Sequence, residues 1–172
     1  MITIRKIKFY LIILFVLGKV YLYANDVSIL HQNNKTVIID SLKLRENELP
    51  EGYKFDKEIV CSNIQPVMLY KEHNLYGALL GEVIKKDFQS ISNENGDAGS
   101  ILYFQFKNRV EESEKEFIKG LIWGENSQPT KQHSESIEFF EGLMVVWCFE
   151  QESLIKKLSQ EKILLYLEIQ TK

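Results

Sequence analysis

The sequence predicts a single α+β domain, built on a mainly antiparallel or mixed sheet with two to four helices packed on it. Hydrophobic residues make up 45% of the 172-residue chain, which is enough for a packed core. Stretches that alternate apolar and polar residues, typical of strands, are interspersed with stretches of helical periodicity. Two predicted strands are neighbours in a hairpin. A parallel doubly wound sheet needs regular strand–crossover–strand alternation instead, so the hairpin argues against that class.

The N-terminus has the pattern of a secretory signal peptide, which we expect over residues 1–24. Its basic region consists of Arg5, Lys6 and Lys8. The apolar run Phe9–Gly18 has the length of a signal-peptide core, whereas a membrane-spanning helix needs roughly 20 apolar residues. Cleavage is expected after Ala24, whose side chain is small. The alternative is an uncleaved anchor, in which residues 20–23 extend the apolar run past Lys19.

Charge and size limit the function classes of the remaining domain, residues 25–172. Removing 24 of the 172 residues leaves 148, the usual size of one domain. The whole chain has a net charge of −3, and the leader carries four cations and no acid, so the mature chain has −7. An acidic domain without a basic stripe is not expected to bind nucleic acid or an anionic membrane. We expect a periplasmic or secreted product with no stable membrane span after cleavage.

The first predicted elements lie between residues 36 and 91. Thr36–Ile39 is β-branched and predicts a strand, and residues 42–49 are a short helix or an extended piece. Pro66 favours an extended conformation at Gln65. Apolar residues at helical spacing predict a helix over residues 75–91, and a strand ending at Ile84 is the alternative. The apolar positions are Tyr76, Leu79, Leu80, Val83, Ile84 and Phe88.

The second half of the chain carries clearer patterns. Residues 93–99 are rich in Asn, Gly and Asp and predict a turn, after which Ile101–Lys107 alternates like a half-buried strand. Residues 110–123 predict a helix with glutamates in its first turns, and Gly124 predicts its end.

A hairpin and a helix complete the predicted fold. The strands Ile137–Phe140 and Leu143–Phe149 flank a turn at residues 141–142. Because the second strand is apolar on both sides, we expect it to be central in the sheet. Residues 152–169 predict the final helix.

Cys61 and Cys148 are the two cysteines of the chain. In an oxidising compartment such a pair can form a disulfide, which would close a long loop and stabilise the fold by about 4–5 kcal/mol in the chain-entropy model. The alternative is a pair of free, buried thiols, because unpaired cysteine is among the most buried residue types. Separation in sequence does not decide between them, since disulfide geometry depends on distance in space.

Catalytic and metal-binding motifs are not evident in the sequence. Residues 96–100 lack the Gly-x-Ser-x-Gly spacing of a nucleophile elbow, and they precede a strand instead of following one. His133, Glu135 and Glu138 are suitable metal ligands, but their spacing matches no metal-binding signature. We therefore expect neither a metal nor a cofactor.

The polar segment 123–136 is the candidate functional loop, because long internal loops often carry function. Its candidate ligand-binding residues are Trp123, His133 and Glu135. Alternatively, Trp123 is the last core residue of its helix. The leading hypothesis is a non-catalytic exported domain that binds a protein or a small molecule. The rival is a small exported hydrolase with a site near this loop. A third hypothesis is an assembly factor with an exposed sheet edge.

Overall fold

The computed structural model describes residues 39–76, 81–124, 128–130, 134–140, 142–150 and 152–170. The predicted signal peptide over residues 1–24 lies outside these residues, as do positions 36–38 of the predicted first strand. Val37–Lys172 forms one compact unit.

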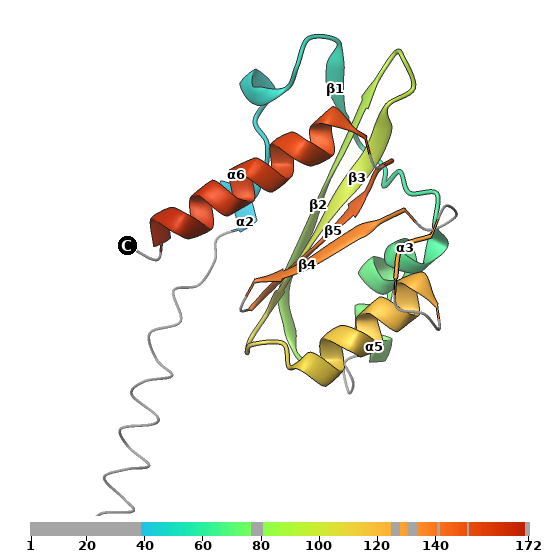
Figure 1. Ribbon diagram of the computed structural model, residues 1–172, viewed down its shortest axis with the longest axis vertical. Coiled ribbons are helices and arrows are strands. Elements are labelled where there is room, and N and C mark those ends of the chain that lie inside the picture. Colours follow the sequence, from blue (N-terminus) through green and yellow to red (C-terminus); the bar gives the residue numbers. More distant parts are fainter. Residues whose placement is uncertain are drawn as a thin grey trace, which may run out of the picture. The chain divides into compact units, whose positions relative to one another are not determined.

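A five-stranded sheet forms the centre of this unit (Figure 1). Its strands are β1 (Tyr53–Asp56), β2 (Val83–Asn93), β3 (Ala98–Phe106), β4 (Ser136–Phe140) and β5 (Leu143–Cys148). Their spatial order is β1-β2-β3-β5-β4, and each neighbouring pair is antiparallel. β1 and β4 are therefore the two edge strands.

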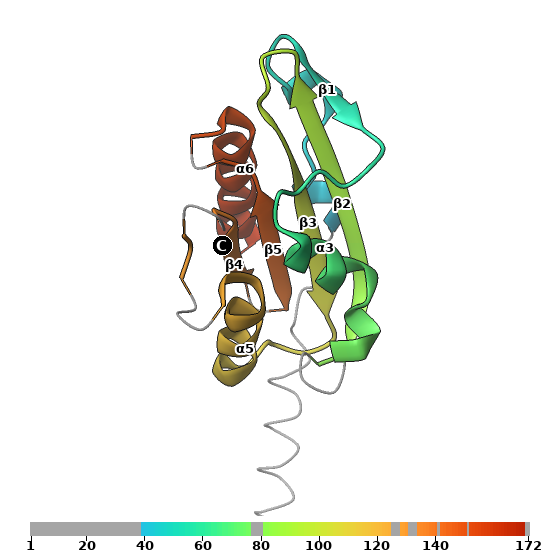
Figure 2. The same ribbon diagram turned by 90° about the vertical axis from the view of Figure 1, so that its right-hand side faces the viewer.

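Helices cover both faces of the sheet (Figure 2). One face carries α2 (Ile39–Leu42) and α6 (Leu154–Gln170), and the other carries α3 (Ile64–Lys71) and α5 (Glu112–Trp123). Two 3-10 helices, η1 (Glu46–Glu48) and η2 (His73–Tyr76), lie in the connections. The described residues thus contain five strands and four α-helices, which confirms the predicted α+β fold class. No helix among them combines the length and the apolar character needed to cross a membrane.

The two cores share the central strands β3 and β5. Successive side chains of a strand point to opposite faces of the sheet. Tyr103 and Val145 therefore pack under α6, whereas Phe104 and Val146 pack under α5. All of β5 is buried, and it lies between β3 and β4. The central position predicted for this strand is confirmed.

Buried polar groups under α6 are hydrogen bonded to one another. The Trp147 indole Nε1 donates to Ser159 Oγ over 3.0 Å, and the Tyr103 hydroxyl donates to Gln89 Oε1 over 3.2 Å. The Gln89 amide also accepts from the backbone N of Leu44 and donates to its carbonyl, each over 2.8 Å. Burial raises the pKa of Tyr103, so its hydroxyl stays protonated and donates. The network joins β2, β3 and the segment after α2.

The helix predicted over residues 75–91 is wrong, because Val83–Asn93 is strand β2. The alternative strand ending at Ile84 is also wrong, since β2 continues to Asn93. β2 pairs with β1 on one side and with β3 on the other. Strand pairing on both sides outweighs the intrinsic helix propensity of these residues, which differs among ordinary residues by less than about 1 kcal/mol per residue. Gly81, with a φ of +69°, adopts a left-handed conformation that does not continue a helix.

The extended conformation predicted at Gln65 is wrong, because Gln65 is the second residue of helix α3. Pro66 is the third residue of α3, and the N–H groups of a first turn have no acceptor within the helix, so proline is tolerated there. The Asn63 side chain caps the helix by accepting from the backbone N of Gln65 over 2.9 Å. Ile39 also differs from its prediction, because it begins α2 instead of ending a strand.

Candidate functional site

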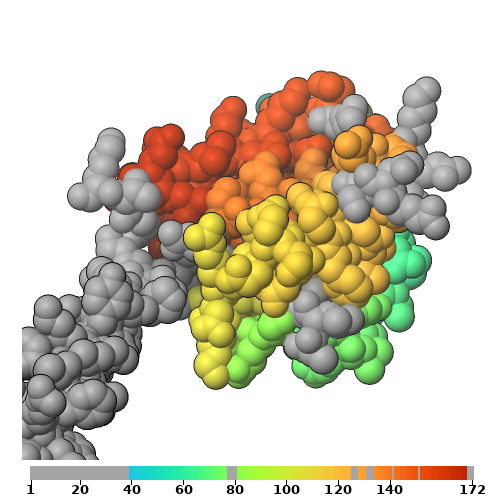
Figure 3. Space-filling view, turned by 60° about the horizontal axis from the view of Figure 1, so that its bottom comes forward, coloured from blue at the N-terminus to red at the C-terminus, as the bar shows by residue number. Residues whose placement is uncertain are grey.

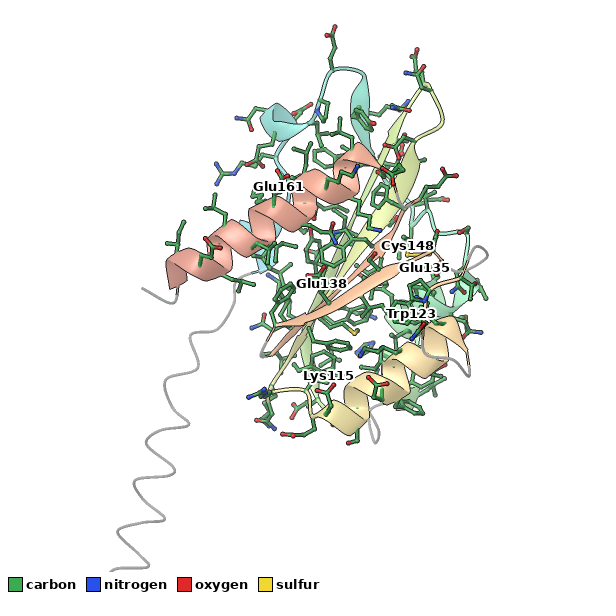
Figure 4. The ribbon with its side chains drawn as sticks, viewed as in Figure 1. Lys115, Trp123, Glu135, Glu138, Cys148 and Glu161 are labelled. Atoms are coloured by element: carbon green, nitrogen blue, oxygen red, sulfur yellow. A yellow bond between two sulfur atoms is a disulfide. The ribbon has the colours of Figure 1, made fainter. Side chains whose placement is uncertain are left out.

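The two ends of the predicted loop meet at one corner of the sheet (Figure 4). Trp123 is the last residue of α5, and Glu135 immediately precedes β4. The Trp123 indole Nε1 donates to the backbone carbonyl of Glu135 over 3.1 Å. Figure 4 shows both residues near Cys148 at the end of β5. His133, the third predicted residue, lies outside the described residues.

Asn63 joins this corner to the start of α3. Its Nδ2 donates to the backbone carbonyl of Ile122 over 3.0 Å and to Glu135 Oε2 over 3.3 Å, while its side-chain oxygen caps α3. Asn63 is 4% exposed and Glu135 is 1% exposed. One buried amide therefore connects α3, the end of α5 and the start of β4. Sequence reasoning missed Asn63, and the signal that could have found it is the capping preference of Asn ahead of an apolar run.

A disulfide between Cys61 and Cys148 lies beside this junction, with 5.1 Å between the two Cα atoms. It ties the segment before α3 to the end of β5. The backbone N of Val60 donates to Ser100 Oγ over 2.7 Å, which adds a second link from this segment to the sheet. Of the two alternatives that the sequence leaves open, the structure shows the disulfide. Such a bond is compatible with an exported protein, because disulfides persist in oxidising compartments.

The acidic residues considered as metal ligands are not brought together. Glu135 contacts Asn63 at the start of α3, whereas Glu138 Oε1 accepts from Gln160 Nε2 of α6 over 3.0 Å. α3 and α6 cover opposite faces of the sheet, so the two carboxylates point to different sides. Within the part of the chain that the structure describes, no three His, Cys, Asp or Glu residues are grouped to hold a metal ion.

We predict that Asn63→Ala lowers the free energy of unfolding by about 2–4 kcal/mol, measured by urea denaturation. Loss of a helix cap costs about 1 kcal/mol, and a buried group left without its donor costs about 1–3 kcal/mol. Asn63→Ser is the matched variant, since serine can cap α3 but cannot donate to both Ile122 and Glu135. It should recover about 1 kcal/mol. An alanine variant as stable as the unmodified protein would contradict this role.

Two of the three predicted site residues, Trp123 and Glu135, therefore join Asn63 in a junction in which buried polar groups pair across three segments of the chain. Buried, paired polar groups of this kind stabilise a fold. Comparison of the chain with protein families, with curated proteins and with solved structures finds no match.

Proposed function

We propose that this chain is an exported module that binds a protein or a small molecule without catalysing a reaction. The observation that carries the proposal is the burial of the Glu135 carboxylate, which is 1% exposed and bonded to Asn63. A general acid or base must come within hydrogen-bonding distance of the substrate. At this corner the Glu135 carboxylate and the Trp123 indole are both used inside the fold, so neither is offered to a substrate for hydrolysis, and a partner would bind at another surface.

Exposed apolar side chains support contact with a partner. Ile64 and Met68 are 61% and 40% exposed, and they lie four residues apart on α3, so they are neighbours on its outer side. Leu75 on η2 is 76% exposed. Neighbouring exposed apolar side chains, such as Ile64 and Met68, are typical of interaction sites.

Export is supported by two independent features. Residues 1–24 have the order of a basic region, a short apolar run and a small residue at the cleavage position. The Cys61–Cys148 disulfide is of the kind that persists outside the cytoplasm. Mass spectrometry of the native product should find Asn25 at its start, and retention of Met1 would contradict cleavage.

Enzyme assays test the non-catalytic part of the proposal. The purified protein is incubated with ester, peptide and glycoside substrates, and His133→Ala is assayed in parallel. We expect no turnover above that of heat-denatured protein. Turnover that His133→Ala abolishes, with unchanged circular dichroism and thermal unfolding, would establish the rival hydrolase function instead.

A further inference from the structure

The two edges of the sheet differ in their chemistry. An edge strand presents backbone N–H and C=O groups that can pair with another chain, and proteins block such edges with short strands and charged residues. β1 contains Lys54 and Asp56 in four residues, and Lys57 and Glu58 follow it. β4 contains a single charged residue, Glu138, with Phe139 and Phe140 beside it. β1 is thus the blocked edge, and β4 lacks this protection.

β4 is accessible between two helices. Figure 3 shows the surface of β4, in orange, between α6, in red, and α5, in yellow. Glu138 contacts Gln160 on the α6 side, and Lys115 of α5 lies 5.9 Å from the ring centroid of Phe139. Within the described residues, β4 pairs with β5 alone. The opposite side of β4, which no described strand occupies, is the side at which a further strand could pair.

The side chains along β4 define what such a strand must carry. Residues opposite one another in neighbouring strands point to the same face of the sheet. In an added strand, the residue opposite Glu138 would point toward α6. The residues of that strand before and after it would point toward α5, next to Ile137 and Phe139. The best complement is therefore a triplet of an apolar, a basic and an apolar residue.

Further contacts on the α6 side favour this triplet. The Glu138 carboxylate accepts one hydrogen bond from Gln160 and interacts electrostatically with Lys156 of α6. A carboxylate has about four acceptor positions, so positions remain for a second cation. Leu164 follows Gln160 by one helical turn and is 49% exposed, so it can contact the aliphatic part of a basic side chain opposite Glu138.

Charge also distinguishes a cationic partner from a second copy of this chain. In a symmetric antiparallel pair of β4 strands centred on Glu138, two carboxylates would face each other, and like charges directly opposite destabilise a sheet. The mature domain carries a net charge of −7, which attracts a basic segment and repels another copy.

We propose that the free edge of β4 docks an extended segment of a partner protein that carries an apolar–basic–apolar triplet, and that this segment adds a sixth strand to the sheet. Main-chain hydrogen bonds provide the affinity in this mode, and the alternating side chains provide the specificity. The inference rests on the proposed binding function and assigns it a surface and a partner class.

The experiment uses two fluorescein-labelled peptides that differ at one position. The first is acetyl-Thr-Val-Thr-Val-Lys-Val-Thr-Val-Thr-amide, and the second has Glu in place of Lys. Binding to the purified exported protein is measured by fluorescence anisotropy at low salt. We expect the Lys peptide to bind at least about tenfold more tightly than the Glu peptide, and Glu138→Lys to reverse the order.

Asp56→Lys is the matched control, since it changes the net charge by the same amount at the β1 edge. It should leave the preference for the Lys peptide in place, and circular dichroism should show both variants folded. Equal binding of the two peptides, or a reversal caused by Asp56→Lys, would overturn the assignment to β4. Sedimentation provides a further test. A concentration-dependent dimer that Phe139→Lys disrupts would also overturn the assignment, because a second copy of this chain would then occupy the β4 edge.

Failure of this inference can be told apart from failure of the proposed function. A protein without hydrolase turnover that does not discriminate between the peptides contradicts the docking edge alone. Turnover that depends on His133 contradicts the non-catalytic function, whatever the peptides show.

Discussion

Replacing Cys61 and Cys148 together by alanine is expected to lower the free energy of unfolding by about 4 kcal/mol. The disulfide joins residues separated by 87 positions, and in the chain-entropy model a loop of that length restricts the unfolded chain by about 4–5 kcal/mol. A domain of this size has a total stability of about 5–15 kcal/mol, so the loss is a large part of it. Urea denaturation, followed by circular dichroism, measures the change.

A reducing agent provides the control for this prediction. The oxidised protein should unfold at a lower urea concentration when dithiothreitol is added, whereas the double alanine variant should not respond to it. If the reducing agent leaves the midpoint of the unmodified protein unchanged, the bond does not stabilise the fold as expected.

Gly99→Ala is expected to destabilise the protein by at least about 3 kcal/mol, because the methyl group has no space. A Cβ atom at Gly99 would lie 2.2 Å from the carbonyl O of Cys148 and 2.6 Å from the ring of Phe149. Carbon atoms in contact are normally about 3.5–4.0 Å apart. The Cys148 backbone is held by the pairing of β5 with β3, so relief requires separation of two central strands.

Thermal unfolding measures this effect, and the melting temperature of Gly99→Ala should fall by roughly 10 °C. Ser92→Ala is the control, since Ser92 lies opposite Ala98 in the same hairpin and the substitution adds no atom. We expect its melting temperature to stay within about 2 °C of the unmodified protein. A similarly small change for Gly99→Ala would show that the strands can separate at little cost.

Elements with a strong local pattern were predictable from sequence. The strand predicted over Ile101–Lys107 lies largely within β3, which runs from Ala98 to Phe106, but β3 is buried on both sides and not half-buried as predicted, because helices cover both faces of the sheet. The two apolar strands predicted on either side of residues 141–142 are β4 and β5. β2 was not predictable in this way. Its apolar residues have helical spacing, and strand pairing on both sides decides its conformation.

The candidate site was only partly predictable for a similar reason. Trp123 and Glu135 lie in one polar segment, so a local pattern in the sequence points to both. Asn63, which bonds the Glu135 carboxylate, is 72 positions away from it. The residues around Glu135 in sequence do not indicate this contact, because the contact forms only when α3 packs beside α5. Two cysteines allow only one disulfide pairing, so its partners were predictable. Whether the bond forms depends on the distance between them in the fold, which is 5.1 Å between the two Cα atoms.

The contrast between the two edge strands also bears on aggregation. Growth of a fibre by strand addition would require β4 of one copy to pair with β1 of the next, and an interface of that kind repeats without closing. The charged side chains of Lys54 and Asp56 oppose this contact. If β4 docks an extended segment as proposed, the charged edge at β1 would keep the opposite end of the sheet from pairing with a second copy, so the protein could bind such segments while resisting polymerisation.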